Sequence, residues 1–320
     1  MVRALFMFCL MSILTLVAST TIKPSYSIDV DGNVVEFVYK DSTIYVATDA
    51  GKLEVYDWQK KSLLYEIKFD TIHDFLGDPI APKVFGVDVN SNGDTLIIMV
   101  QDEGGERVLY QYKDKKLTKL LDKNAHIQMR EARFIDDNHI LIASMSNELI
   151  LFQIPNKKIL YKNKLSLSTF SDFQLNEDHS KIASTCESGI VYVVDTKTGK
   201  VVKTLEGGNK DNVFKVDYKN SYVLTCGQDR KAVVYGADNT IKAIYPTQFL
   251  VYAGALNKDA SLSAFGINEQ NDIGIYDNIT KSLKYRLTGQ QSTLNTIVFA
   301  DDKTLISSSD DNHILIWRIP

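Results

Sequence analysis

The segment that decides the fold is ESGIVYVVDTKTGKVVKTLEGG, residues 187–208. It combines an alternating strand pattern, VYVVD (191–195), with a turn rich in Asp, Thr and Gly and a second strand pattern, KVVKTLEGG (200–208). The residues in front of it, KIASTCESG (181–189), predict another strand that ends in a tight turn. Each strand is short and each connection is polar, which is typical of antiparallel hairpins.

The same unit recurs along the chain. Its alternating strand is found seven times, as LEVYD (53–57), LYQYK (109–113), LILFQ (149–153), VYVVD (191–195), AVVYG (232–236), IGIYD (273–277) and ILIWR (314–318). The penultimate residues of these segments, Tyr56, Tyr112, Phe152, Val194, Tyr235, Tyr276 and Trp317, are separated by 56, 40, 42, 41, 41 and 41 residues. Four short strands in a unit of about 40 residues form one propeller blade, so the sequence predicts an all-β, seven-bladed β-propeller with four antiparallel strands per blade.

The two ends of the chain predict how this ring closes. The seventh unit has three strands and stops at Pro320, whereas one spare strand, Ile22 to Val30, precedes the first unit, which starts near Val34. Pairing the spare strand with the last unit completes seven blades and covers an edge that would otherwise stay open.

The first 19 residues are expected to be a signal peptide and not part of the fold. Met1–Arg3 carries a positive charge, residues 4–18 form an apolar run of fifteen, and Val17-Ala18-Ser19 supplies small residues for cleavage after Ser19. Crossing a bilayer takes about 20 apolar residues, so an uncleaved anchor is the less favoured alternative. The predicted domains are the signal peptide, 1–19, and the propeller, 20–320, with no stable membrane insertion after cleavage.

Charge and cysteine content exclude several function classes. The formal charge of −4 becomes −5 without Arg3, because 35 basic residues then face 40 acidic ones, and a mildly acidic chain is not expected to bind nucleic acid. Cys186 and Cys226 lie in no CxxC motif. They fall in the second strands of blades four and five, where packed sheets lie about 10 Å apart and a disulfide needs Cα atoms within about 7 Å. We therefore expect two free, mostly buried thiols.

The units resemble WD repeats over essentially all of residues 20–320, best in SSSDDNHILIWR (307–318) and in residues 187–208. The Trp-Asp pair survives only as Trp317-Arg318, Tyr56-Asp57, Val194-Asp195 and Tyr276-Asp277, and the Gly-His pair only as Gly207-Gly208 and Gly289-Gln290. The buried Asp–His–Ser/Thr–Trp network of that family is therefore expected to be absent in most blades. The resemblance implies a non-catalytic protein-interaction scaffold.

Three segments, IAPKVFGVDV (80–89), QFLVYAGAL (248–256) and STLNTIVF (292–299), resemble NapL-type accessory proteins of periplasmic nitrate reductase. That resemblance implies a periplasmic location, an accessory role in nitrate reduction and the reductase components as partners.

The innermost strand of each blade places alternate residues toward the central channel. Aligned on Phe299, that parity reads Glu36/Val38, Gly86/Asp88, Glu131/Arg133, Asp172/Gln174, Lys215/Asp217, Ala253/Ala255 and Thr296/Val298. The acids Glu36, Asp88, Glu131, Asp172 and Asp217 could form a cation site at the axis. The favoured interpretation is a hydrated channel in which Arg133 and Lys215 pair with neighbouring acids, because buried charges are normally paired.

The 56-residue interval contains an insertion, residues 69–83, with Phe75, Leu76, Ile80 and two prolines. It is either a fixed lid that packs on the propeller face or an insertion of no consequence. The histidines show no metal-ligand spacing, and no GxSxG or phosphate-binding loop is present. The sequence therefore predicts no enzyme, metal or cofactor; the alternative is a propeller enzyme or cofactor-binding protein with its site at the channel.

Overall fold

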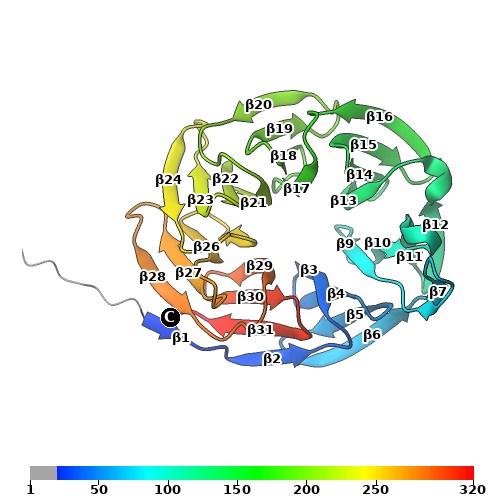
Figure 1. Cartoon of the computed structure of the whole chain (residues 1–320), viewed down its shortest axis with the longest axis horizontal. Helices are drawn as coiled ribbons and strands as arrows, with labels where there is room; N and C mark the ends of the chain where they lie inside the picture. Colours follow the sequence, from blue (N-terminus) through cyan, green and yellow to red (C-terminus); the bar gives the residue numbers. More distant parts are fainter. Residues whose placement is uncertain (1–19) are drawn as a thin grey trace, which may run out of the picture.

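The computed structural model describes residues 20–320, and the predicted signal peptide lies outside the described residues. Seven β-sheets, the blades of the propeller, are arranged in a ring around a central axis (Figure 1). The predicted seven-bladed, all-β fold is confirmed. The seven alternating segments that set the 41-residue period form the third strand of each blade.

Each blade has four strands that follow one another from the axis to the rim, and the blades run from one to seven in chain order. The innermost strands are β3 (Val34–Lys40), β9 (Val84–Val89), β13 (Met129–Asp136), β17 (Phe170–Leu175), β21 (Val213–Lys219), β25 (Gly254–Leu256) and β29 (Leu294–Asp301). The second strands are β4 (Thr43–Thr48), β10 (Thr95–Gln101), β14 (His139–Ser144), β18 (Lys181–Cys186), β22 (Tyr222–Gly227), β26 (Leu262–Gly266) and β30 (Thr304–Ser309). The third strands are β5 (Lys52–Asp57), β11 (Arg107–Lys113), β15 (Glu148–Gln153), β19 (Val191–Asp195), β23 (Lys231–Tyr235), β27 (Ile273–Asp277) and β31 (His313–Arg318). The outer strands are β6 (Ser62–Lys68), β12 (Lys116–Leu121), β16 (Lys158–Lys164), β20 (Val201–Leu205), β24 (Ile241–Pro246), β28 (Leu283–Leu287) and, for blade seven, β2 (Tyr26–Asp29).

The core of the protein lies in the seams between blades. Seven separate clusters of buried apolar side chains each join two neighbouring blades. The seam between blades three and four is built from Leu141, Ala143, Leu149, Phe170, Phe173, Leu175, Ile182 and Val194. Because one face of each sheet packs on the next sheet, the ring is held by burial of apolar area distributed around its whole circumference.

The ring closes through the N-terminal segment, as predicted, but in two pieces. Strand β2 pairs antiparallel with β31 and completes blade seven. Strand β1 (Thr20–Ile22) pairs parallel with β28 as a fifth strand of blade six. The single spare strand expected over residues 22–30 is thus two short strands on two blades, interrupted around Pro24, which has no N–H to donate to a ladder. The segment therefore spans the seam between blades six and seven from outside (Figure 1).

The buried polar network of WD repeats was expected to be absent from most blades, and a variant of it forms in blade seven with Gln290 at the histidine position. The Trp317 indole N–H donates to Ser307 Oγ at 2.8 Å, and Ser307 Oγ donates to Gln290 Oε1 at 2.8 Å. The Gln290 amide donates to Ser309 Oγ at 2.6 Å. Blade five contains a shorter version, in which Thr225 Oγ1 donates to Asn209 Oδ1 at 2.6 Å. A side-chain amide supplies one donor and one acceptor, as a neutral imidazole does, so it can take the place of the histidine.

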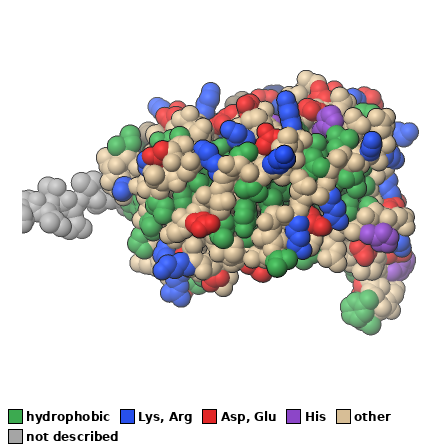
Figure 2. All heavy atoms as spheres, turned by 90° about the horizontal axis from the view of Figure 1, so that it is seen from above, with side chains coloured by type: hydrophobic (Ala, Val, Ile, Leu, Met, Phe, Trp, Pro, Cys, Tyr) green, Lys and Arg blue, Asp and Glu red, His purple; other side chains and the backbone are tan. Residues whose placement is uncertain are grey.

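The insertion in residues 69–83 is not a lid on the propeller face. Strands β7 (Ile72–His73) and β8 (Pro79–Ile80) form a small hairpin whose tip leaves Phe75 90% and Leu76 73% exposed. Pro82, at its base, is buried against the body of the protein. Figure 2 shows a knob tipped by hydrophobic side chains that projects from one face of the disc, on the side where Figure 1 draws β7. The lid expectation was wrong because the hairpin forms its own hydrogen bonds and turns its apolar tip outward.

Two further expectations concern helices and thiols. Within residues 20–320 the helical elements are 3-10 turns, η1 (Glu103–Gly105) and η2 (Lys123–Ala125), and no helix there is long and apolar enough to cross a bilayer. Cys186 and Cys226 are free and buried, as expected. The two thiols lie on opposite faces of their blades and point apart: Cys186 Sγ is 3.9 Å from Ser166 Oγ, in the connection from blade three, and Cys226 packs toward Gly254 of blade six.

Candidate functional site

The central channel is narrowed by charged side chains half-way along its length. A hollow of about 560 Å³ is lined by residues at the start of the inner strands, and a second of about 600 Å³ by residues at their end. The two hollows therefore open on opposite faces of the disc. They share the residues of this constriction, which we call the waist: Glu36, Glu131, Arg133, Asp172, Lys215, Asn295 and Thr296.

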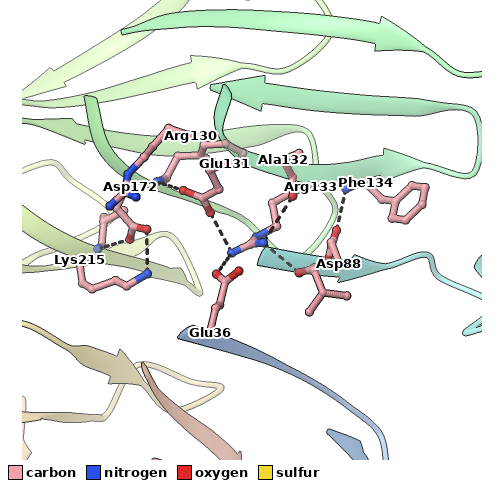
Figure 3. A network of polar contacts seen from close by, with 12 residues as sticks. Glu36, Asp88, Arg130, Glu131, Ala132, Arg133, Phe134, Asp172 and Lys215 are labelled. Atoms are coloured by element: carbon pink, nitrogen blue, oxygen red, sulfur yellow. Dashed lines mark hydrogen bonds and ion pairs between the residues drawn. The ribbon is translucent and has the colours of Figure 1, made fainter. Parts of the chain in front are cut away.

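Arg133 is the centre of the waist (Figure 3). Its Nη2 forms a short ion pair with Glu36 of blade one and lies 2.9 Å from Glu131 Oε1 of its own blade. Glu36 is reached across blade two, because the equivalent position there is Gly86. A Cβ at Gly86 would lie 2.7 Å from Glu36 Oε2, so the absent side chain is what leaves room for this pair.

Lys215 forms the second ion pair. Its Nζ lies 3.0 Å from Asp172 Oδ1, and both residues come from neighbouring inner strands, β21 and β17 (Figure 3). The predicted pairing of Arg133 and Lys215 with acids of the channel is thus observed. The waist is less exposed to solvent than the predicted hydrated channel, however, since Glu131 and Asp172 are both buried.

The carboxylates also bind the backbone of the next blade. In four consecutive seams a carboxylate oxygen of one inner strand accepts the backbone N–H of the following inner strand. The pairs are Asp88 with Phe134 at 2.7 Å, Glu131 with Phe173 at 3.2 Å, Asp172 with Val216 at 2.8 Å and Asp217 with Leu256 at 2.8 Å. We call these contacts the axial ties. They satisfy buried donors at the ends of the sheets and thereby explain why acids recur on this parity.

Burial and neighbouring charge shift the pKa values of these acids in different directions. Burial raises the pKa of Asp88. Burial, together with the nearby Asp172 and Glu36, raises the pKa of Glu131 to about 8 against the opposing effect of Arg133. Burial acts in the same sense on Glu36, but the positive charges of Arg133 and Lys215 outweigh it and lower the pKa of Glu36. Glu36 is therefore the charged partner of Arg133, and Glu131 is the acid whose ionisation burial opposes most strongly.

The structure brings seven of the eight predicted site residues to the channel and leaves one apart. Glu36, Asp88, Glu131, Arg133, Asp172, Lys215 and Asp217 line the two hollows. Phe75 lies at the tip of the β7–β8 hairpin, outside both. Within residues 20–320 no group of three or more His, Cys, Asp or Glu side chains is arranged to hold a metal ion.

The mouth of the 560 Å³ hollow contains residues that were not predicted to belong to a site. Phe85, Arg130, Phe214 and Tyr252 occupy equivalent positions one residue before the parity that faces the waist, and they surround the opening. Phe214 and Tyr252 stack with ring centroids 4.8 Å apart. Arg107 lies over Phe85 with its guanidinium carbon 3.8 Å from the ring centroid. The sequence does contain a signal for Phe85, Arg130, Phe214 and Tyr252, because aromatic and basic residues recur at one position of the inner strands. That position has the parity opposite to the one that carries the channel acids.

The comparisons with known proteins agree with this fold. Residues 281–318 match the family model described as WD domain, G-beta repeat. They comprise β28 to β31, including the blade with the Gln290 network. No curated protein matches the chain. The match and the seven four-stranded blades together support a WD-repeat propeller family, whose members generally bind proteins and are typically non-catalytic scaffolds.

Proposed function

We propose that this protein is an exported, protein-binding accessory factor of periplasmic nitrate reduction. The observation that carries the proposal is the tip of the β7–β8 hairpin, where Phe75 and Leu76 are 90% and 73% exposed. Two adjacent large apolar side chains at the tip of a projecting hairpin offer an apolar surface that a binding partner can cover. The binding partner is expected to supply an apolar pocket that covers them.

The tip is ordered before any partner binds. Asp74 Oδ1 accepts the backbone N–H groups of Leu76 and Asp78 at 2.8 and 2.9 Å. The Asp74 N–H donates to the Asp78 carbonyl at 2.9 Å, which closes the turn. Because little backbone freedom remains to be lost, docking of this tip has a small entropic cost.

The charges around the tip favour a protein over a membrane surface. Residues 69–82 contain three aspartates, Asp70, Asp74 and Asp78, and no Lys or Arg. Binding to anionic lipid relies on basic residues beside the apolar ones, and these acids would be repelled. A protein pocket with an apolar floor and polar rim fits the tip better.

Export and the link to nitrate rest on the sequence resemblance, and the arrangement of the fold is compatible with both. The three segments that resemble NapL-type proteins converge on the same hollow, to which they contribute Lys83, Tyr252 and Asn295. A shared surface at the channel mouth is what a common partner would require.

Site-directed photo-crosslinking tests this proposal. A photoreactive phenylalanine analogue at position 75, in cells respiring nitrate, is expected to form an adduct with a component of the reductase system. The matched control is position 279, where Ile279 is 83% exposed in the β27–β28 turn. Identical adducts from both positions, or adducts with lipid alone, would overturn the proposal.

Export has its own measurement. The intact mass of protein recovered from the periplasm is expected to correspond to a chain that starts at or near Thr20. Full-length chain recovered in the membrane fraction would show that the first 19 residues act as an anchor.

One observation favours the alternative of an enzyme with its site at the channel. A buried carboxyl group with a pKa raised to about 8, as in Glu131, is a feature of acid–base catalysts. Against it, Glu131 already accepts a backbone N–H of blade four. If Glu131→Gln abolished nitrate-dependent growth while the protein stayed folded and the position-75 adduct persisted, the enzyme hypothesis would replace the scaffold.

A further inference from the structure

Lys83 and Arg130 line one side of the channel mouth, and a third cation, Arg107, stacks on Phe85, which lines it as well. Lys83 and Arg107 lie over the ring of Phe85, with Lys83 Nζ 5.9 Å from its centroid, and Arg130 belongs to the next inner strand. Among residues 20–320 none of the three forms an ion pair with a carboxylate, whereas Arg133 and Lys215 at the waist both do. Three cations therefore lie close together at one opening of a chain whose net charge is −4.

Contacts with the backbone and with Phe85 hold Arg107, one of the three cations, in place. Arg107 Nη1 donates to the backbone carbonyls of Met129 and Arg130, at 2.9 and 3.3 Å, while its planar group stacks on Phe85. Burial and the charge of Arg130 lower the pKa of Arg107 to about 10. Arg107 keeps its charge at neutral pH, and the backbone contacts and the ring of Phe85 hold its guanidinium in a fixed orientation for an anion.

We propose that Lys83, Arg107 and Arg130 bind a carboxylate-rich segment of a partner protein at the channel mouth. This inference rests on the proposed role as a protein-binding factor and names the chemistry of the segment that enters the hollow. The volume of about 560 Å³ accommodates a few side chains of such a segment. The stacked rings of Phe214 and Tyr252 on the opposite side provide an apolar surface for residues between the acids.

The rest of the mouth argues for separate carboxylates over a nucleic-acid backbone. Asp49 and Asp310 lie on the side formed by blades one and seven. A continuous phosphate chain crossing the opening would approach these acids, whereas a peptide can present its acids to the cations and neutral residues elsewhere. A cationic arc on one side and an acidic arc on the other also fix the direction in which a peptide lies.

The inference is tested with an acetylated, amidated hexaglutamate peptide that carries a fluorophore, by anisotropy at low ionic strength. Lys83→Gln/Arg130→Gln is expected to weaken its binding by about tenfold or more, because two charge-assisted contacts are lost. The matched control, Lys115→Gln/Lys116→Gln, removes the same charge from the opposite end of blade two and is expected to leave the affinity within about twofold. Arg107→Lys keeps the charge and loses the planar fork, so it is expected to weaken binding as well.

Further probes separate the sources of the carboxylate. A hexaglutamine peptide with a free C-terminus is expected to bind much more weakly than hexaglutamate; equal binding would assign the site to a chain terminus and overturn the proposal. Equal loss in both double variants, unchanged binding in Lys83→Gln/Arg130→Gln, or tighter binding of a thymidine oligonucleotide would also overturn it. Equal melting temperatures of the variants are required for the comparison.

Failure of this inference can be told apart from failure of the proposed function. If the position-75 adduct forms in cells but hexaglutamate does not bind, the partner uses the hairpin alone and the cation cluster has no part in it. If hexaglutamate binds through the cluster but no adduct forms, the acidic ligand belongs to a protein other than the one proposed.

Discussion

Two arcs of this ring are held together differently. From blade two to blade six, carboxylates of the inner strands bind the backbone N–H groups of the next blade at the axis. In blades six and seven the equivalent positions are Ala253/Ala255 and Thr296/Val298, which have no carboxylate. There the ring is joined at the rim by β1 and β2 and inside blade seven by the Gln290 network.

The difference shows what each kind of contact is suited for. Neighbouring blades of the arc from two to six are already connected by the chain, so little entropy is lost when they pack together. A carboxylate that accepts a buried N–H is enough to fix their positions. The closing seam joins the two ends of the chain, and its contacts must offset a far larger loss of freedom. A full backbone ladder with apolar side chains behind it supplies more free energy than one polar contact can.

Loss of the rim contact, the pairing of β2 with β31, is therefore expected to lower the stability of the protein most. A chain that lacks residues 22–30 loses β2, and with it Ile28 and Val30 from the seam between blades seven and one. We expect aggregation or failure to fold, because the edge of β31 is exposed and an apolar cluster is opened. Unchanged thermal unfolding of the purified deletion variant would mean that the ring closes without this segment.

The axial ties are expected to show the next largest effect. Asp172→Ala removes the acceptor of the Val216 N–H and leaves Lys215 unpaired in a largely buried position. Destabilisation of about 3–5 kcal/mol is expected from urea unfolding, and Asp172→Ala/Lys215→Met should recover part of it. Thr296→Ala, at the equivalent position in blade seven, is the control and should cost well under half as much. Equal costs at the two positions would remove the distinction between the arcs.

The same arc is expected to respond to pH through Glu131. The folded protein raises the pKa of this group from its ordinary value near 4.5 to about 8, so the folded state binds the proton more tightly than the unfolded chain does. Its stabilising contribution is complete below pH 4.5 and is lost as the pH rises to about 8. Arg133, Asp172, Lys215 and Glu36 are the charges that face it.

Comparison of wild type with Glu131→Gln isolates this effect. Between about pH 5 and 8 the unfolding free energy of the wild type is expected to fall relative to that of the variant, by a few kcal/mol at most. Glu206→Gln, at the surface of blade four, serves as the control and should run parallel to the wild type. A wild-type curve parallel to that of Glu131→Gln would show that the carboxyl group is ionised throughout this range.

Much of this fold could be predicted from the sequence because the same strand pattern recurs seven times. The period near 41 residues and the surplus strand at one end were sufficient for blade number and closure. The division of that strand into β1 and β2 was not predictable from alternation, since it depends on two blade edges that meet only in the assembled ring. Pro24 was a local signal of the break.

The candidate site was only partly predictable, for a similar reason. Parity placed the seven charged residues on the axis and suggested that Arg133 pairs with an acid. It could not show that the partner is Glu36, two blades away, because that contact depends on the missing side chain of Gly86. The parity of the inner strands could not predict the role of Arg107, because this residue lies on the third strand β11 and contacts the inner strand only through the ring of Phe85.

The smallest expected effect concerns the Gln290 network, the polar counterpart in blade seven of the axial ties. Gln290→Ala leaves the hydroxyl groups of Ser307 and Ser309 without this partner in a buried site, and a loss of about 1–3 kcal/mol is expected. Gln290→His restores a donor and an acceptor at the position where WD repeats have histidine, so it should be close to wild type or more stable. Gln248→Ala, at an exposed glutamine, should change the unfolding free energy by less than about 0.5 kcal/mol. Fluorescence of Trp317, whose indole N–H is bonded to Ser307, reports on the network when it is measured in a Trp58→Phe background. If Gln290→His were as unstable as Gln290→Ala, the amide would be needed for its shape, and the network would be a feature of this chain and not a variant of the one found in WD repeats.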